Sequence, residues 1–343
     1  FVALLLQLAG WIYVSMGSVR AIEGYGYPAG LFAPHPQLGF VYRPGFSGLF
    51  NGAGYGEIPI NINPQGFRDD SFTPMPADRA RIAFLGDSIV FGAGVRAEDR
   101  FTECLESTDT PAPLSTLPPV ILNLGVNSYT FGHYLSLAEL GFLGLQPSAV
   151  VVGLTLNDIA PMEGAGPAQT KQRGAEGLHT PNWLARGKDR IGGTYAAHFL
   201  SELSTRLRYA LMNADKREEY HTKWMRSVVR AWKLPEIQAQ FSKDVERFAA
   251  LTDAAEVPFG FVLFPELNDV TDPDGFSGPR RTALKLLQAH GVKVCDLYTA
   301  FATQPDPTQL FLAYDSVHYS PYGHQLVCET VRRCLADWDV LSP

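Results

Sequence analysis

Strand-like and helix-like stretches alternate along most of the chain after residue 76. Short apolar runs bounded by turn residues are typical of buried strands, and they occur at 81–86, 120–124, 149–156, 258–264 and 292–297. Between and after these runs, apolar residues recur at helical spacing over 99–107, 131–145, 279–290 and 320–338. This alternation predicts an α/β domain in which a parallel sheet of about five strands is sandwiched by helices.

The N-terminal stretch 1–19 is almost wholly apolar, with Gln7, Ser15 and Ser18 as polar interruptions. A helix of this length covers roughly the 30 Å hydrocarbon core of a bilayer. We therefore expect a transmembrane helix that anchors the chain, with a cleaved signal segment as the alternative. After Arg20 no Lys or Arg occurs before Arg43, which is typical of a translocated flank. The expected location is a bacterial inner membrane with the catalytic domain on its periplasmic or extracytoplasmic side.

Two stretches depart from the alternation. Residues 20–75 are rich in Gly, Pro and aromatic side chains that need burial, which predicts an extended segment wrapping over the domain. Its aromatic residues include Phe40, Tyr42, Phe46 and Phe50. Within the expected catalytic domain 76–343, residues 159–234 show no strand signal but contain a charged helical run, which predicts a helical insertion that caps the site.

Composition excludes several classes of function. The net charge of −7 and pI near 5.6 argue against a nucleic-acid partner, which requires a basic face. No glycine-rich phosphate loop, zinc-type Cys/His spacing or calcium loop occurs in the sequence, so we expect no cofactor and no metal. The four cysteines, Cys104, Cys295, Cys328 and Cys334, form no metal-like pattern, and we expect them to be buried free thiols.

Two short motifs carry the candidate chemistry. Gly86-Asp87-Ser88 follows the strand-like run 81–86, and Asp315-Ser316-Val317-His318 precedes the last helix. A serine hydroxyl becomes an effective nucleophile when a base takes its proton and a third group orients that base. Each motif alone is typical of a turn or a helix cap. Together, in this order and at these positions, they indicate a catalytic triad of Ser88, His318 and Asp315.

With the strand-Gly-Asp-Ser unit, a glycine after the second strand, an asparagine after the third and the late Asp-x-x-His, the chain resembles the SGNH (GDSL-type) hydrolase family. The resemblance implies a flavodoxin-like parallel sheet, with Ser88 as nucleophile, His318 as general base and Asp315 as the orienting carboxylate. It also implies an oxyanion hole formed by the backbone N–H groups of Ser88 and Gly125 and by the side-chain amide of Asn157.

The resemblance covers residues 81–338 outside the insertion, with two departures from the family pattern. Thr155 stands where the third block, usually Gly-x-Asn-Asp, has its glycine. The second block continues as Val126-Asn127-Ser128, where many members carry another glycine.

The resemblance implies carboxylic esters as substrates, including acetyl esters on carbohydrates. We therefore expect a membrane-anchored serine ester hydrolase that acts on a small-molecule or glycan ester through an acyl-enzyme. One alternative is an O-acetyltransferase of envelope polysaccharide that uses the same triad, and a groove lined by Trp183, Trp224 or Trp232 beside Ser88 would favour a sugar ligand. The other alternative is a non-catalytic accessory subunit with a membrane protein partner, since a fold does not by itself imply a function.

Overall fold

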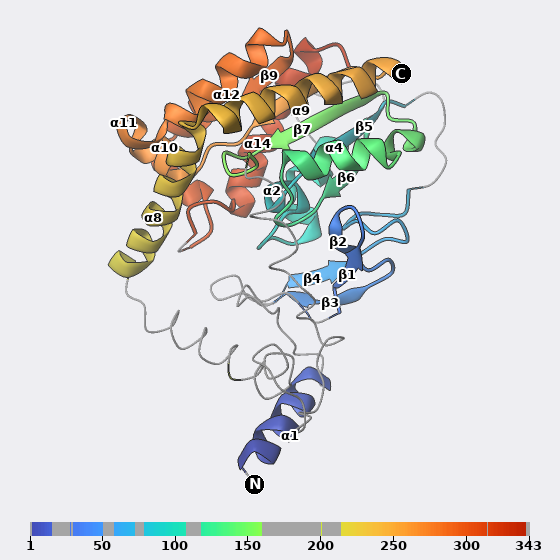
Figure 1. Cartoon of the computed structure of the whole chain (residues 1–343), viewed down its shortest axis with the longest axis vertical. Coiled ribbons are helices and arrows are strands. Elements are labelled where there is room, and N and C mark those ends of the chain that lie inside the picture. Colours follow the sequence, from blue (N-terminus) through green and yellow to red (C-terminus); the bar gives the residue numbers. More distant parts are fainter. Residues whose placement is uncertain are drawn as a thin grey trace.

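A central parallel sheet organises the chain (Figure 1). The computed structural model describes residues 2–15, 28, 30–50, 58–72, 79–107, 118–159, 200, 214–313 and 315–340. The sheet has five strands in the order β6-β5-β7-β8-β9, all parallel. They are β5 (Arg81–Gly86), β6 (Val120–Gly125), β7 (Ala149–Leu154), β8 (Phe259–Leu263) and β9 (Lys293–Asp296). The predicted five-stranded α/β architecture is confirmed.

Helices cover both faces of the sheet, which explains why its strands are apolar without alternation. In β5, Ala83 and Leu85 belong to one hydrophobic cluster, whereas Ile82 and Phe84 belong to a second cluster on the other face. The first cluster includes buried residues of α4 (Phe131–Glu139), α9 (Pro235–Ala254) and α12 (Gly278–Ala289), and the second those of α3 (Phe101–Glu106) and α14 (Pro321–Asp337).

Short elements connect these layers. The helices among them are α2 (Ser88–Phe91), α10 (Leu267–Thr271), α11 (Pro273–Phe276) and α13 (Tyr298–Ala302). The 3₁₀ turns are η1 (Ala97–Asp99), η2 (Phe142–Leu145) and η4 (Pro307–Leu310). Of the expected insertion 159–234, the structure describes Ile159, residue 200 and 214–234, in which α8 (Ala214–Trp232) forms a long helix. The rest of the predicted cap lies outside the described residues.

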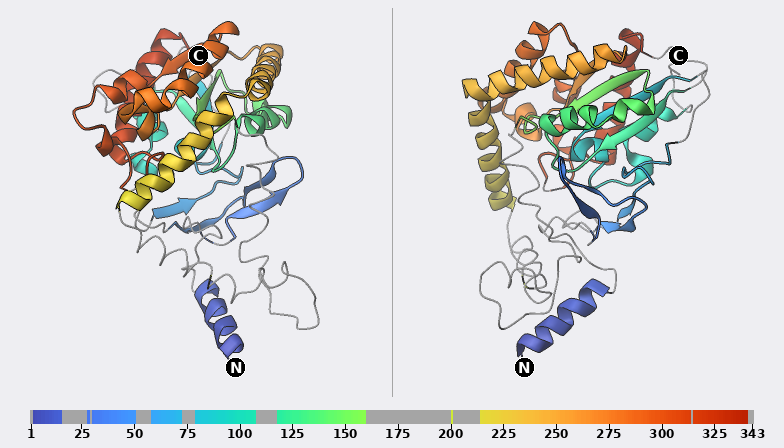
Figure 2. Two further views of the ribbon diagram at one scale, coloured as in Figure 1. Left: turned by 60° about the vertical axis from the view of Figure 1, so that its left-hand side comes forward. Right: turned by 45° about the vertical axis from the view of Figure 1, so that its right-hand side comes forward.

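The described part of the segment 20–75 contains two β-hairpins. Strands β1 (Phe32–His35) and β2 (Gly39–Tyr42) pair antiparallel, as do β3 (Ser47–Phe50) and β4 (Ile58–Asn61). Phe40, Tyr42 and Phe50 are buried, and the ring of Tyr42 lies 5.1 Å from that of Phe91 in α2. Figure 2 shows the hairpins below the α/β domain, on the side that faces α1. The aromatic residues of this segment therefore join the core of the catalytic domain.

The structure describes only part of the expected N-terminal helix. It runs over α1 (Val2–Ser15), 14 residues, and residues 16–19 lie outside the described part. Among the described helices, none combines the length and the apolar character needed to cross a bilayer. The expected transmembrane helix over 1–19 is therefore not supported.

The expectation of free thiols is wrong. The structure pairs Cys104 of α3 with Cys328 of α14, and Cys295 of β9 with Cys334 of α14. Cys328 and Cys334 are six residues apart and lie on different sides of the helix, so neither can pair with the other. Cys328 faces α3 and Cys334 faces β9. The sequence did not reveal the two bridges because their partners come from other elements of the fold.

Candidate active site

The three residues of the predicted triad come together beyond the carboxyl ends of the strands. His318 Nε2 lies 2.8 Å from Ser88 Oγ, and His318 Nδ1 lies 2.7 Å from Asp315 Oδ2. Ser88 is the first residue of α2, directly after β5, whereas Asp315 and His318 belong to the loop before α14. A chain of two hydrogen bonds thus connects the serine hydroxyl through the imidazole to the carboxylate.

A tight turn between β5 and α2 presents Ser88. Asp87 caps the helix, and its Oδ1 accepts the N–H of Ile89 at 2.9 Å. A Cβ atom on Gly86 would lie 2.2 Å from Cγ2 of Val90, so only glycine lets α2 fold back this closely onto β5. Because Ser88 is the first helical residue, its N–H has no acceptor within the helix and is available to a ligand.

Asp315 also organises its own loop. Its Oδ1 accepts the N–H groups of Val317 and His318 at 2.8 and 3.0 Å, which leaves Oδ2 for the imidazole. The loop is fastened from outside by Leu267, whose N–H donates to the carbonyl of Ser316 at 2.9 Å. The orientation of the catalytic histidine is therefore set by backbone as well as side-chain hydrogen bonds.

The carboxylates around His318 control its basicity. Burial by itself lowers the pKa of His318, but the charge and hydrogen bond of Asp315, together with the charge of Asp87, raise it above its ordinary value. A raised pKa makes the neutral imidazole a stronger base toward the serine hydroxyl. The side chain of His318 is 23% exposed, so the base faces a region that a substrate can reach.

The structure gives Gly125 a different role from the one predicted. Its N–H donates to Asn123 Oδ1 at 3.0 Å and is therefore already engaged. A Cβ atom at this position would lie 2.2 Å from the backbone nitrogen of Phe91, so glycine is needed for the close packing of β6 on α2. The expected oxyanion donor at Gly125 is replaced by a packing role. Three residues later, Ser128 has φ of 63°, a left-handed conformation that is uncommon for serine.

Asn157 lies in the turn that follows β7, as predicted. This turn is closed by two hydrogen bonds between Thr155 and Asp158: the N–H of Asp158 donates to the carbonyl of Thr155 at 3.1 Å, and the N–H of Thr155 donates to Asp158 Oδ2 at 3.0 Å. Asn157 Oδ1 is buried, and no described residue forms a hydrogen bond with it. Within the described structure, the side-chain oxygen of Asn157 therefore makes no hydrogen bond that would hold the amide in another orientation.

Trp232 does not line a groove beside Ser88. It is 1% exposed, and its Nε1 donates to the carbonyl of Leu156 at 2.7 Å, beneath the turn that carries Asn157. Trp183 and the side chain of Trp224 lie outside the described residues.

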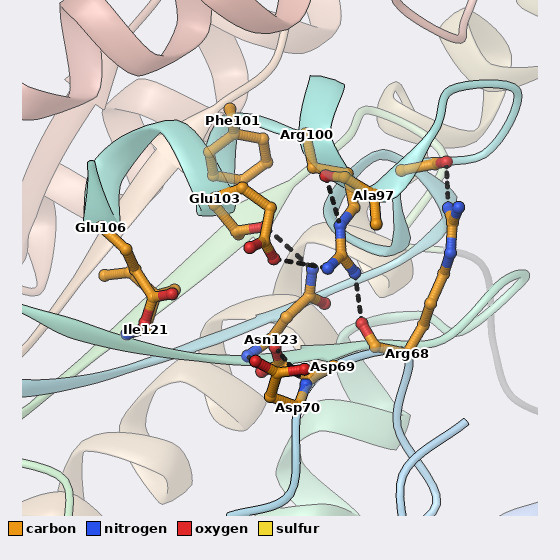
Figure 3. A network of polar contacts seen from close by, with 12 residues as sticks. Arg68, Asp69, Asp70, Ala97, Arg100, Phe101, Glu103, Glu106, Ile121 and Asn123 are labelled. Atoms are coloured by element: carbon orange, nitrogen blue, oxygen red, sulfur yellow. Dashed lines mark hydrogen bonds and ion pairs between the residues drawn. The ribbon is translucent and has the colours of Figure 1, made fainter. Parts of the chain in front are cut away.

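Buried polar residues that sequence reasoning missed support the nucleophile from the N-terminal segment. Arg68 is 3% exposed, and its guanidinium donates to the carbonyls of Phe91 and Gly92 at the end of α2. Arg100 donates in turn to the carbonyl of Arg68, as Figure 3 shows. Asp69 Oδ2 accepts the N–H of Asn123 at 2.8 Å, on β6. A lone arginine in the stretch Gly66-Phe67-Arg68 was the only sequence signal for this network.

In the ranges that the structure describes, no three His, Cys, Asp or Glu side chains are arranged to hold a metal ion. Each chemical group that the triad requires comes from the protein itself.

The family is identified by comparison. The model of the GDSL-like lipase/acylhydrolase family matches residues 84–326, well over half of the chain, so the chain belongs to this family. It is an ester hydrolase. No curated protein matches the chain in a sequence search.

Several solved structures align with the chain at low sequence identity and low structural similarity. The lipase/acylhydrolase from Enterococcus faecalis is 14% identical, with 77% of this chain and 98% of that chain covered and a TM-score of 0.41. A catalytic mutant of Axe2, an acetylxylan esterase from Geobacillus stearothermophilus, is 15% identical, with 75% and 94% covered and a TM-score of 0.40. A lipolytic G-D-S-L protein from Veillonella parvula is 13% identical, with 74% and 97% covered and a TM-score of 0.40.

Proposed function

We propose that this chain hydrolyses carboxylic esters through an acyl-enzyme formed on Ser88. The observation that carries the proposal is the continuous relay from Ser88 Oγ to His318 and on to Asp315, with distances of 2.8 and 2.7 Å. His318 takes the hydroxyl proton as Ser88 attacks the ester carbonyl, and it returns the proton to the leaving alcohol. A water molecule activated by the same imidazole then releases the acid and restores the serine.

The oxyanion of the tetrahedral intermediate requires donors that are in place before the reaction. We assign the N–H of Ser88 and the side-chain amide of Asn157 to this role, and the N–H of Ser128 takes the place expected for Gly125. Ser128 follows β6 in the same turn region and is exposed. Each such donor contributes on the order of 3 kcal/mol to transition-state stabilisation.

Acetyl esters on carbohydrates are the substrate class that we favour, because the family resemblance implies them. The alternative acyl acceptor is a sugar hydroxyl, which would make the enzyme an O-acetyltransferase of envelope polysaccharide. Incubation with an acetylated glycan and an unacetylated glycan acceptor separates the two: free acetate supports hydrolysis, and acetyl groups on the acceptor support transfer. A purely accessory subunit is disfavoured, because its fold would not require Ser88 and His318 at hydrogen-bond distance.

We also propose that the domain works outside the cytosol, in the periplasm or a similar oxidising compartment. The support for this location is the pair of disulfides, which persist in such compartments and are rare in the cytosol. Thiol alkylation of protein isolated from cell fractions tests it. Four reactive cysteines in a cytosolic fraction would contradict the proposal.

Labelling with a fluorophosphonate, a reagent that traps activated serines, tests the catalytic assignment without knowledge of the substrate. Wild-type protein should be labelled, and Ser88→Ala should abolish both labelling and hydrolysis of p-nitrophenyl acetate. His318→Ala should lower both by at least about 10³-fold. Ser136→Ala is the matched control, because Ser136 Oγ bonds the carbonyl of Gly132 within α4, away from the triad. Full labelling of Ser88→Ala would refute the assignment.

A further inference from the structure

Thr155, the residue that departs from the family pattern, begins the turn that carries Asn157 and contacts the turn that carries Ser88. Its hydroxyl donates to Asp87 Oδ2 at 3.0 Å, and its side chain is 1% exposed. Asp87 precedes the nucleophile and caps α2 through Ile89, so the hydroxyl reaches the element that carries Ser88. A glycine at position 155 would have no atom that could make this bond.

The backbone of Thr155 fixes the other turn. Its N–H and carbonyl both bond Asp158, and Asn157 lies within the loop that these bonds close. Tyr134 supports the same carboxyl group from α4, since its hydroxyl donates to Asp158 Oδ2 at 3.1 Å. Burial raises the pKa of Asp158 well above its ordinary value, and the nearby charge of Asp87 adds to the rise. Thr155 thus bonds two carboxyl groups. One is that of Asp87, which caps α2, and the other is that of Asp158, whose raised pKa favours its neutral form.

From these contacts we propose that Thr155 is a positioning residue that sets the distance between the nucleophile Ser88 and the oxyanion donor Asn157. The proposal rests on the function assigned above, in which Asn157 binds the oxyanion. Ser88 and Asn157 follow β5 and β7, which are neighbours in the sheet but pair only through their backbones up to Leu85 and Val152. Beyond that point, within the described part of the chain, the hydroxyl of Thr155 joins the two turns through its hydrogen bond to Asp87.

Such a connection matters most in the transition state. The amide of Asn157 must meet the oxygen that becomes charged only after Ser88 has attacked, and misplacement by about 1 Å weakens that bond strongly. Ground-state binding of the substrate does not depend on this alignment. Loss of the hydroxyl should therefore lower kcat and leave KM nearly unchanged.

Three substitutions at this position separate the hydroxyl from the rest of the side chain. Thr155→Val has nearly the same shape without the hydroxyl, and it should lower kcat for p-nitrophenyl acetate about tenfold with KM within twofold. Thr155→Ser keeps the hydroxyl and should retain kcat within about twofold. Thr155→Gly introduces the residue usual in the family, and its kcat should fall as much as that of Thr155→Val. This variant keeps the test available if Thr155→Val fails to fold.

A double-mutant cycle with Asn157→Ala tests whether Thr155 acts through the oxyanion donor. Asn157→Ala alone should lower kcat by about 10²-fold. If alignment of Asn157 is what Thr155 supplies, Thr155→Val should cost less than about twofold further in the Asn157→Ala background. The affinity for a boronic acid, which forms a tetrahedral adduct on the serine, should fall in parallel with kcat across the single variants.

Thr252→Val is the matched control. Thr252 is also fully buried, but its hydroxyl bonds the carbonyls of Phe248 and Ala249 within α9. Its kcat should equal that of the wild type. The proposal is overturned if Thr155→Val retains kcat, if Thr155→Ser loses as much as valine, or if the effects of Thr155→Val and Asn157→Ala multiply in full. Retained activity in Asn157→Ala would instead remove the oxyanion assignment, while the labelling of Ser88 would still stand.

Discussion

Arg68 offers a direct test of how the N-terminal segment supports the catalytic domain. The family match begins at residue 84, so Arg68 lies outside it. Its guanidinium donates to the carbonyls of Phe91 and Gly92 at 3.2 and 2.7 Å, and to those of Pro59 and Val95 at 3.1 and 3.0 Å. The first two carbonyls end the helix that begins with Ser88, and a helix leaves its last carbonyls without internal donors.

Arg68→Met removes these four hydrogen bonds while it retains most of the aliphatic volume. Loss of each of these four buried hydrogen bonds costs about 1 kcal/mol, which gives about 4 kcal/mol for the set. Methionine no longer requires burial of a cation, and we take this to offset about 1 kcal/mol. The free energy of unfolding should therefore fall by about 3 kcal/mol.

Urea unfolding at constant pH measures this change, provided that the slope of the transition is the same in both proteins. Hydrolysis of p-nitrophenyl acetate well below the transition should also be slower, because the end of α2 has lost its donors. Arg79→Met is the matched control: Arg79 bonds the carbonyls of Pro118 and Pro119, away from α2, and should leave kcat unchanged. A free energy of unfolding within 0.5 kcal/mol of wild type, on the scale of ordinary surface substitutions, would refute the reasoning.

Three further predictions concern the triad, a disulfide and a buried acid. Asp315→Asn should lower kcat by about 10³–10⁴-fold. Because the charge of Asp315 raises the pKa of His318, the variant should also move the acidic limb of the kcat/KM profile to lower pH. An acidic limb at the same pH as in the wild type would contradict this. Replacement of both Cys104 and Cys328 by serine should lower the free energy of unfolding by about 3 kcal/mol, measured in guanidinium chloride, and an unchanged midpoint would count against the bridge. Burial raises the pKa of Glu106 to about 7, so the native state holds a proton that the unfolded chain releases, and stability falls as pH rises from about 4.5 to 7. Glu106→Gln should reduce the loss of stability between pH 5 and pH 8 by about 1–2 kcal/mol, and an equal loss in both proteins would disprove the role of this group.

The strands of the sheet could be predicted from the sequence because each is a short apolar run that is buried on both faces. The first of them, 81–86, coincides with β5 from end to end. The hairpins at 32–61 could not be predicted in the same way, since their strands are only four residues long and each contains a Gly or a Pro. Their burial depends on contacts with α2, which the local pattern does not encode.

The site shows the same division. Ser88, Asp315 and His318 stand in short motifs at element boundaries, and such motifs are visible in a single sequence. Gly125 was assigned by its place after a strand, but which amide faces the ligand depends on hydrogen bonds that only the structure gives. The carbonyls of Phe91 and Gly92, which Arg68 bonds at the end of α2, are more than twenty residues from it along the chain. Interactions of this kind follow from the folded topology.

The arrangement of the two disulfides has a consequence for synthesis of the protein. Both bridges end on α14, so Cys104 and Cys295 enter the proposed oxidising compartment before either of their partners when the chain is translocated from its N-terminal end. During that interval they are the only two of the chain's four thiols in that compartment. A bond between them would block both native bridges and would have to be undone by thiol–disulfide exchange. Correct oxidation therefore depends on a delay until the last helix has emerged or on an isomerase, and the yield of active enzyme should respond to whichever of these the producing cell provides.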